Sequence, residues 1–291
     1  MIVRPIAGGV EALAPAKLNL YLEVLGRRPD GYHEVETLMV ALDLFDELTF
    51  REDEAGAVTL QCDDPSLPVD GRNLVVRAAE LLKSESGVRA GARITLKKAI
   101  PAQAGLAGGS SDAAATLAAL DRLWDLNSPP GRLAELAGRI GSDVAFFLQG
   151  PAAVCRGRGE RVEAVSLPTP LHCVLVVPHV GLSTADVYRR LSPPRQPRSI
   201  GPVLDALARG PADVGRSLFN RLQPVAESIR PELATVRDAL ADLDPPLCGS
   251  LMSGSGSAYY GLARDLDAAE RAAEALKTLG LGLVRVVTCG P

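Results

Sequence analysis

PAQAGLAGGSSDAAAT, residues 101–116, joins a glycine-rich loop to the start of a helix. The first turn of a helix has amide hydrogens without intrahelical partners and carries a partial positive charge, so an anion is its natural ligand. Gly105, Gly108 and Gly109 allow the backbone to adopt positive φ values and to lie close to a ligand. Three residues of types that cap helix starts follow them, namely Ser110, Ser111 and Asp112. The segment therefore predicts a loop that wraps a phosphate chain.

The residues after the loop have helical periodicity. Apolar side chains fall at spacings of four, three and four, at Ala113, Leu117, Leu120 and Trp124. A capped turn is the alternative interpretation, because Gly and Ser dominate turns in general. The segment is not a Walker loop, because Gly109 stands where that motif has lysine. A dinucleotide fingerprint also fits poorly, since the glycine spacing differs and the later acidic residue is absent.

Length and composition set limits on the class of protein. The chain has 291 residues, of which 47% are hydrophobic, and this suits about two domains with a core in each. The net charge of −4 comes from 31 basic and 35 acidic residues mixed along the chain, which argues against a nucleic-acid surface. No signal peptide or membrane span is apparent. We expect a cytoplasmic monomer or weak homodimer with no nucleic-acid or membrane partner; its metal ligands are unknown.

Strands and helices are predicted to alternate along the chain. Strand patterns run from Leu18 to Leu25 and up to Phe50, a helix is expected at 73–84 and a strand at 94–98, directly before the glycine-rich loop. Further helices are expected at about 131–139, 184–191, 201–209, 231–241 and 265–278, and strands near 152–155, 172–177, 257–262 and 283–288. SLPTPL, residues 166–171, interrupts the pattern, so the predicted domains are 1–166 and 167–291.

Three further segments are candidates for chemistry. Lys17 and Asn19 share one face of a predicted strand, although a lone lysine at a strand end is usually solvated. Asp143, in GSDVAFFL, lies beside apolar sequence and therefore needs a partner. A second Gly/Ser loop, MSGSGSAYYGL at 252–262, fits either a simple hairpin turn or a close approach of a ligand to the backbone.

These segments together carry a resemblance to the GHMP kinase superfamily, whose namesakes include galactokinase, homoserine kinase and mevalonate kinase. PAQAGLAGGSSDAAAT resembles the phosphate loop of the superfamily almost throughout, and the match spans nearly the whole chain. PAKLNLYLEVLGRRPDGYHEVETLM, residues 15–39, resembles the members that act on a diphosphocytidyl substrate. The resemblance implies a two-domain α+β fold with the active site in the interdomain cleft.

The implied activity is ATP-dependent phosphorylation, with Mg²⁺, of the 2-hydroxyl of diphosphocytidyl methylerythritol in the nonmevalonate isoprenoid pathway. By family position, Asp143 orients or deprotonates the attacking hydroxyl, and Lys17 beside it neutralises charge at the transferring phosphoryl group. This division suits a loose transition state, in which positioning and charge stabilisation matter most. The rivals are a superfamily kinase for homoserine or a mevalonate derivative, and a catalytically silent ligand sensor.

The resemblance also implies the residues that bind substrate and nucleotide. Tyr32 would stack on the cytosine, and His33 would form hydrogen bonds with its edge. Tyr188 would contact the opposite face of the base, with Thr184 nearby, and Asn19 would also contact the substrate. Without the family, a surface loop residue is the favoured interpretation of His33. The nucleotide would meet Asn73, Lys98, Pro101, Ala102, Gln103, Ala104, Gly105, Leu106, Ala107, Gly108, Gly109, Ser110 and Ser111. The chain departs from the family pattern at Gln103, at Ala145 in place of proline, and at Arg221 in place of aspartate.

Overall fold

The computed structural model describes residues 1–290, which fold into two compact units. The first unit comprises Met1–Ala16, Leu44–Ala102 and Ala107–Gly150. The second comprises Lys17–Asp43, Gln103–Leu106 and the chain from Pro151 onward. The predicted domains, 1–166 and 167–291, stay a prediction. The two compact units are interleaved along the chain. The reason is that strands β2, Gly9–Arg27, and β3, His33–Asp53, are 19 and 21 residues long and each contributes to both units.

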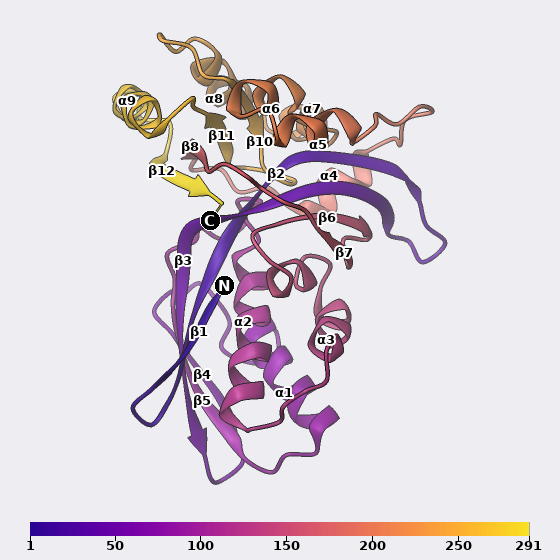
Figure 1. Ribbon diagram of the computed structural model, residues 1–291, viewed down its shortest axis with the longest axis vertical. Helices are drawn as coiled ribbons and strands as arrows, with labels where there is room; N and C mark the ends of the chain where they lie inside the picture. The colour runs from indigo at the N-terminus through magenta and orange to yellow at the C-terminus, as the bar shows by residue number, and fades with distance from the viewer. Residues whose placement is uncertain (291) are drawn as a thin grey trace. The chain divides into compact units, whose positions relative to one another are not determined.

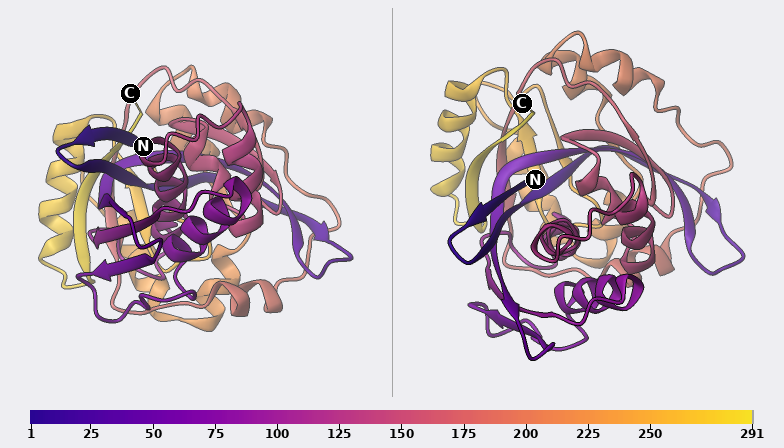
Figure 2. Two further views of the ribbon diagram at one scale, coloured as in Figure 1. Left: turned by 90° about the horizontal axis from the view of Figure 1, so that it is seen from below. Right: turned by 60° about the horizontal axis from the view of Figure 1, so that its bottom comes forward.

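The first unit places three helices against strands (Figure 1). Its elements beside β2 and β3 are β1 (Ile2–Ile6), β4 (Val58–Cys62), α1 (Leu74–Ser86), β5 (Gly91–Lys97), α2 (Gly108–Leu123), α3 (Arg132–Ile140) and the 3₁₀ helix η1 (Ala145–Leu148). β5 pairs antiparallel with β3, from Glu47↔Lys97 to Asp53↔Gly91, and parallel with β4. α1, α2 and α3 contact one another, as the right view of Figure 2 shows.

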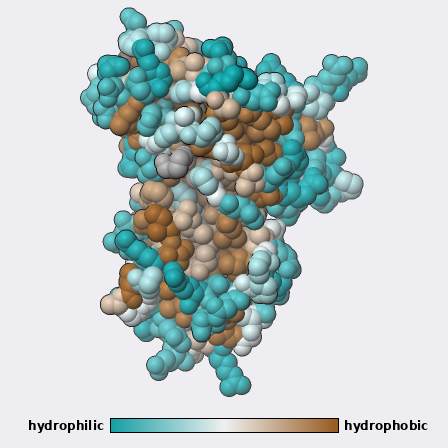
Figure 3. All heavy atoms as spheres, in the orientation of Figure 1, coloured by the Kyte–Doolittle hydropathy of each residue, from teal (hydrophilic) through white to brown (hydrophobic). Residues whose placement is uncertain are grey.

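Alanine dominates the packing of α2. Ala113, Ala114, Ala115 and Ala119 are buried together with Leu117 and Leu120, so other elements approach the helix backbone closely. In Figure 3, hydrophobic residues gather in the middle of the lower part of the view, in the region of α2, and hydrophilic residues lie at the edges. The predicted apolar stripe is confirmed, but burial extends around most of the helix because its residues are small.

The second unit contains the remaining helices and strands. They are β6 (Ala152–Gly157), β7 (Arg161–Ala164), β8 (Leu171–Val177), α4 (Thr184–Arg190), α5 (Gly201–Leu207), α6 (Pro211–Ser217), β9 (Phe219–Asn220), α7 (Gln223–Ile229), α8 (Glu232–Ala241), β10 (Gly249–Met252), β11 (Tyr259–Leu262), α9 (Leu266–Lys277) and β12 (Leu283–Cys289). β8 lies between β12 and β11, antiparallel to both, and β10 pairs with β11. α9 packs on β8 and β12 (Figure 1). The core cluster includes Val174, Val236 and Tyr259.

The structure confirms the mixed α+β composition and the six predicted helices outside the glycine-rich segment to within two residues at each end. Helices α6 and α7 were not predicted from the sequence. Each is seven residues long and has proline in its first turn. Among residues 1–290, no helix has both the length and the apolar character required to cross a membrane.

Candidate active site

The glycine-rich loop adopts a conformation that suits anion binding. α2 begins at Gly108 after Ala107, whose φ is 56°, and no side chain among residues 1–290 caps this helix start. Gln103 also has a positive φ, 53°, and such left-handed conformations at residues other than glycine cost roughly 1–3 kcal/mol each. The expectation that Ser110, Ser111 and Asp112 cap the helix is wrong, because the helix starts two residues before Ser110. The first-turn amides therefore have no side-chain acceptor and can bond a phosphate oxygen.

Two buried polar atoms at the start of α2 have no hydrogen-bond partner within residues 1–290. They are Ser111 Oγ and Asp112 Oδ1. Buried polar groups are normally hydrogen-bonded, so an unpaired hydroxyl in the first turn of an uncapped helix fits a ligand that supplies the partner. Gly109 is also open, since an added Cβ would meet only Leu74 Cδ1, at 3.8 Å. These features fit the phosphate groups of a nucleotide.

Gly105 is required by packing rather than by the ligand alone. A Cβ at this position would lie 2.1 Å from the carbonyl oxygen of Ser253, and the φ of Gly105 is +76°. Ser253 Oγ donates to the carbonyl oxygen of Gly105 at 3.0 Å. The second Gly/Ser loop of the sequence thus packs directly on the first, and it connects β10 to β11 as the hairpin that the sequence allowed.

Lys98 lies in a buried cluster of charges in the first unit. Its ammonium donates to Asp46 Oδ2 and, at 2.9 Å, to Asp112 Oδ2. Asp46 Oδ1 also accepts from the amides of Ala99, at 2.6 Å, and Ile100, at 2.9 Å. Burial opposes the charged form of Lys98, but the two carboxylates outweigh it and raise the lysine pKa. Asp46 thus fixes the backbone that leads into the phosphate loop, and contact of Lys98 with a nucleotide stays a prediction.

Asp112 is expected to make stability depend on pH. Burial, assisted by the charge of Asp46 and opposed by Lys98, raises its pKa from the ordinary 3.8 to about 7. Between these values the folded protein holds a proton that the unfolded chain has released, so this group's contribution to stability falls as pH rises from about 4 to 7 and is constant above. Asp112→Asn lacks this proton, so we expect its melting temperature to rise relative to that of the wild type as the pH is raised from 5 to 8. If the two proteins differ in melting temperature by the same amount at pH 5 and at pH 8, the raised pKa of Asp112 is wrong.

The second unit buries Lys17 among polar groups of β2 and the two Gly/Ser loops. Only 3% of Lys17 is exposed. Its Nζ donates to Asn19 Oδ1 at 2.6 Å and to the carbonyl oxygen of Gly105 at 2.7 Å. A Cβ at Gly254 would lie 3.1 Å from the same Nζ, so glycine lets the second loop lie against the ammonium. The solvated interpretation of Lys17 is therefore wrong: its charge is held at the phosphate loop.

Asp143 lies in the turn between α3 and η1, in the first unit, and is half-buried. The turn forms although Ala145 replaces proline. The amide of Val144 donates to the carbonyl oxygen of Gly141 at 3.5 Å, and the amide of Phe147 donates to the carbonyl oxygen of Val144 at 3.3 Å. Ala145 is itself buried and begins η1. The closeness of Asp143 to Lys17 stays a prediction, because the two residues belong to different units.

The predicted cytosine-binding residues lie around the hairpin between β2 and β3. Tyr32 is 54% exposed, and the guanidinium carbon of Arg158 lies 5.0 Å from its ring centre. The ring of His33 lies 5.2 Å from that of Tyr188. Burial, and then the charge of Arg27, lowers the pKa of His33, which favours the neutral ring at pH 7. A neutral imidazole can donate from one nitrogen and accept at the other, as recognition of a base edge requires.

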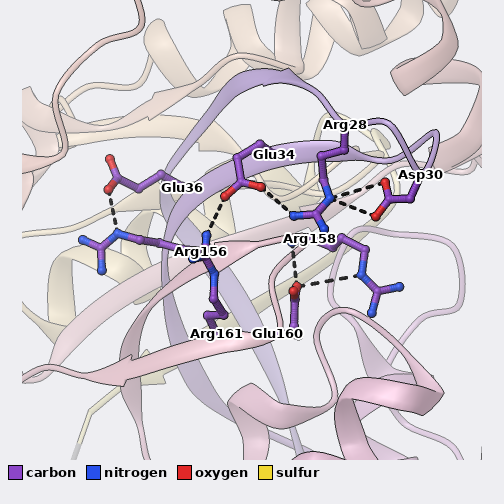
Figure 4. Close-up of polar contacts among 8 residues, drawn as sticks. All are labelled: Arg28, Asp30, Glu34, Glu36, Arg156, Arg158, Glu160 and Arg161. Carbon is purple, nitrogen blue, oxygen red and sulfur yellow. Dashed lines mark hydrogen bonds and ion pairs between the residues drawn. The ribbon is translucent and has the colours of Figure 1, made fainter.

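Ion pairs fix the hairpin that carries Tyr32 and His33. Figure 4 shows Glu34 between two arginines, with Arg28 at 2.7 Å and Arg161 at 2.6 Å. Arg28 also pairs with Asp30 at 3.0 Å, and Asp30 accepts from the amide of Tyr32 at 3.1 Å. Each partly exposed pair contributes little by itself, about 0–1 kcal/mol, but together they link β7 to the hairpin. The aromatic ring is thus exposed on a constrained turn.

The remaining predicted contacts have structural partners of their own. Asn73 caps α1, since its Oδ1 accepts from the amide of Val75 at 2.9 Å. Thr184 Oγ1 lies 2.7 Å from Ser255 Oγ, so this threonine adjoins the second Gly/Ser loop. Gln103 is exposed and its Oε1 would meet a Cβ at Gly181 at 3.3 Å. Binding of substrate or nucleotide by these residues stays a prediction.

Two side chains that hold the predicted site residues in place were not predicted from the sequence. Thr37 bonds Asn19, Asp46 bonds Lys98, and both are buried in β3. An acidic residue within the apolar run LDLFDELTF was the available signal for Asp46. No local signal singled out Thr37, because threonine is common in strands. At the departure Arg221, the guanidinium forms two hydrogen bonds, at 2.8 and 2.7 Å, with the fully buried carboxylate of Glu23.

An uncapped glycine-rich helix start beside the buried Lys98 is typical of a phosphate-binding protein, and comparison with known families gives the class. The GHMP kinases N terminal domain matches residues 73–151, and the GHMP kinases C terminal domain matches residues 203–280. The chain belongs to the GHMP kinase family.

Relatives with high sequence identity share one name, and a more distant protein shares only the fold. The chain is 48% identical to a 4-diphosphocytidyl-2-C-methyl-D-erythritol kinase from Pelotomaculum thermopropionicum, over 91% of this chain and 92% of that protein. It resembles the crystal structure of a 4-(cytidine 5'-diphospho)-2C-methyl-D-erythritol kinase with a TM-score of 0.80 and 42% identity, over 97% of this chain and 99% of the other. A homoserine kinase from Cytophaga hutchinsonii, 22% identical with a TM-score of 0.78 over 100% and 97% of the two chains, shares the fold.

Proposed function

We propose that this protein transfers the γ-phosphoryl group of ATP to the 2-hydroxyl of 4-diphosphocytidyl-2-C-methyl-D-erythritol. Identity of 48% with a kinase named for this substrate, over nearly the full length of both chains, supports the substrate. The main structural support for phosphate binding is the start of α2 at Gly108. Among residues 1–290 this helix start has no side-chain cap, and the Ser111 hydroxyl in its first turn has no hydrogen-bond partner. Both features favour a phosphorylated ligand over a merely structural turn.

The loop residues fit a nucleotide triphosphate. The amides at the start of α2 would bond phosphate oxygens, and Ser111 Oγ would gain the partner it lacks. When bound, ATP supplies the phosphoryl group, and Mg²⁺ accompanies its phosphates. Mg²⁺ is usually held by nucleotide phosphates together with one or two protein groups, so a larger cluster of ligands is not required.

Lys17 and Asp143 would act on the reacting groups in different ways. The ammonium of Lys17, fixed by Asn19 and Gly105, would offset negative charge at the transferring phosphoryl group. Asp143 would accept the proton of the acceptor hydroxyl or orient it for attack. The two side chains would thus serve the same transfer, Lys17 at the phosphoryl group and Asp143 at the acceptor hydroxyl.

A competition assay tests the substrate. Purified protein with ATP and Mg²⁺ should phosphorylate 4-diphosphocytidyl-2-C-methyl-D-erythritol, and CDP should compete with that substrate. Phosphorylation of mevalonate or homoserine without inhibition by CDP would reject the assignment in favour of another GHMP kinase activity. Binding of both ligands without turnover would instead indicate a ligand sensor. A cytoplasmic location and a monomer or weak homodimer complete the proposal, and size-exclusion chromatography tests the latter.

Tyr32→Ala is expected chiefly to raise the KM for the cytidine substrate. The ring is exposed on a constrained turn, and stacking on a base is worth about 1–3 kcal/mol, so we expect a rise in KM of roughly tenfold with little change in kcat. Tyr32→Phe is the matched control, because it keeps the ring and should keep the KM. Initial rates at varied substrate concentration measure both values. An unchanged KM in the alanine variant would remove Tyr32 from the binding site.

A further inference from the structure

Four buried side chains alternate along one face of β2. Lys17, Asn19, Tyr21 and Glu23 are spaced by two residues, and each is at most 3% exposed. A row of buried polar groups must be satisfied within the protein, and each of these has a partner from another segment. The Asn19 side chain bonds Lys17 on one side and a residue of β3 on the other, so the residue of β3 can affect the position of the lysine through Asn19.

Thr37 is that partner. Its Oγ1 donates to the carbonyl oxygen of Tyr21 at 2.6 Å and accepts from Asn19 Nδ2 at 2.8 Å. A hydroxyl has a single hydrogen, so once it donates to a carbonyl it can only accept from another neighbour. The amide of Asn19 is thereby oriented with its nitrogen toward Thr37 and its oxygen toward Lys17.

The orientation matters because an amide has two different ends. Asn19 Oδ1 accepts from Lys17 Nζ at 2.6 Å, whereas a turned amide would present N–H groups to an ammonium that has no acceptor. The backbone of Asn19 is held independently, since Tyr260 Oη donates to its carbonyl oxygen at 3.0 Å. Thr37 therefore acts on the end of the Asn19 side chain, whose oxygen is also the only end that the donor Lys17 can bond.

We propose that Thr37 is a positioning residue for Lys17, acting through the amide of Asn19. This inference rests on the proposed function, because it assigns Thr37 an effect on the phosphoryl-transfer step. The hydrogen-bonded series runs from the Tyr21 carbonyl through Thr37 and Asn19 to Lys17, and Lys17 in turn bonds the Gly105 carbonyl of the phosphate loop. Thr37 itself contacts no reacting group in this series.

The test compares Thr37→Val, which keeps the shape but removes the hydroxyl, with Thr37→Ser, which keeps the hydroxyl. We expect Thr37→Val to lower kcat about tenfold with each KM within about twofold, the pattern for an interaction realised in the transition state. Thr37→Ser should restore kcat to within about threefold of the wild type. Thr288→Val is a matched control, because that strand threonine also bonds a side chain, His172 Nδ1 at 3.1 Å, and its loss should leave kcat unchanged.

A double-mutant cycle separates positioning from general structural damage. If Thr37 acts through Asn19, Thr37→Val should lower kcat no further in the Asn19→Ala background, because the amide to be oriented is gone. Additive losses, an unchanged kcat in Thr37→Val, or failure of Thr37→Ser to restore activity would each overturn the proposal.

A crystal structure of Thr37→Val gives a readout that does not depend on the substrate. We expect Lys17 Nζ to move away from the Asn19 side chain and the Gly105 carbonyl oxygen. An unmoved Nζ would overturn the proposal. If the wild type fails to phosphorylate the cytidine substrate, the proposed function fails, and the position of Nζ in this structure still decides the role of Thr37.

Discussion

Asp143→Ala is expected to lower kcat by at least about a hundredfold while ATP still binds, as loss of a positioned acid or base commonly does. The residue lies half-buried in a turn that hydrogen bonds between backbone groups close. Removal of the side chain leaves those backbone groups in place and should therefore spare the fold. Single-turnover rates measure the chemical step, and calorimetry with a nonhydrolysable ATP analogue measures binding.

Asp143→Asn distinguishes the two possible roles of the carboxylate. An amide can still orient a hydroxyl by accepting its hydrogen bond, but it cannot take the proton. A loss in kcat as large as that of the alanine variant favours a base, and a much smaller loss favours an orienting group. Asp267→Asn, at an exposed position on α9, is the control for a lost carboxylate and should retain full activity. An unchanged kcat in Asp143→Ala would refute either role.

Lys17→Met is expected to lower kcat by about 10²–10³-fold, the range seen when one preorganised donor to a developing charge is lost. The change removes the ammonium that Asn19 and Gly105 hold at the phosphate loop. It leaves Asn19 Oδ1 without this donor, at a cost of about 1–3 kcal/mol in stability, whereas the Gly105 carbonyl keeps its bond from Ser253. Thermal melting should be recorded beside the kinetics.

Lys17→Gln separates charge from hydrogen bonding, because glutamine retains an N–H donor without the positive charge. We expect its kcat to fall nearly as far as that of Lys17→Met, with a smaller loss of stability. Lys83→Met is a matched control, since the ammonium of Lys83 also donates to a glycine carbonyl, that of Gly56, far from the phosphate loop in sequence. Near-wild-type kcat in Lys17→Gln would show that the charge of Lys17 is not used.

The sequence by itself determined the family, and it predicted the phosphate loop and six of the helices. Short-range features suffice for these, because helix periodicity, glycine content and the residues around PAQAGLAGGSSDAAAT act within a few positions of one another. The same features misplaced the helix cap: the chain enters α2 through Ala107 in a left-handed conformation, which no preference of alanine predicts.

Only the tertiary structure decided which groups hold the site. Lys17 meets the Gly105 carbonyl across 88 residues of sequence, and Asp46 reaches the Ala99 amide across 53. Two long strands and two packed loops create these contacts, and buried polar groups must then find partners among whatever segments the fold brings near. Such partners follow from pairing register and packing, which depend on the whole chain, so residues like Thr37 carry no local signal of their role.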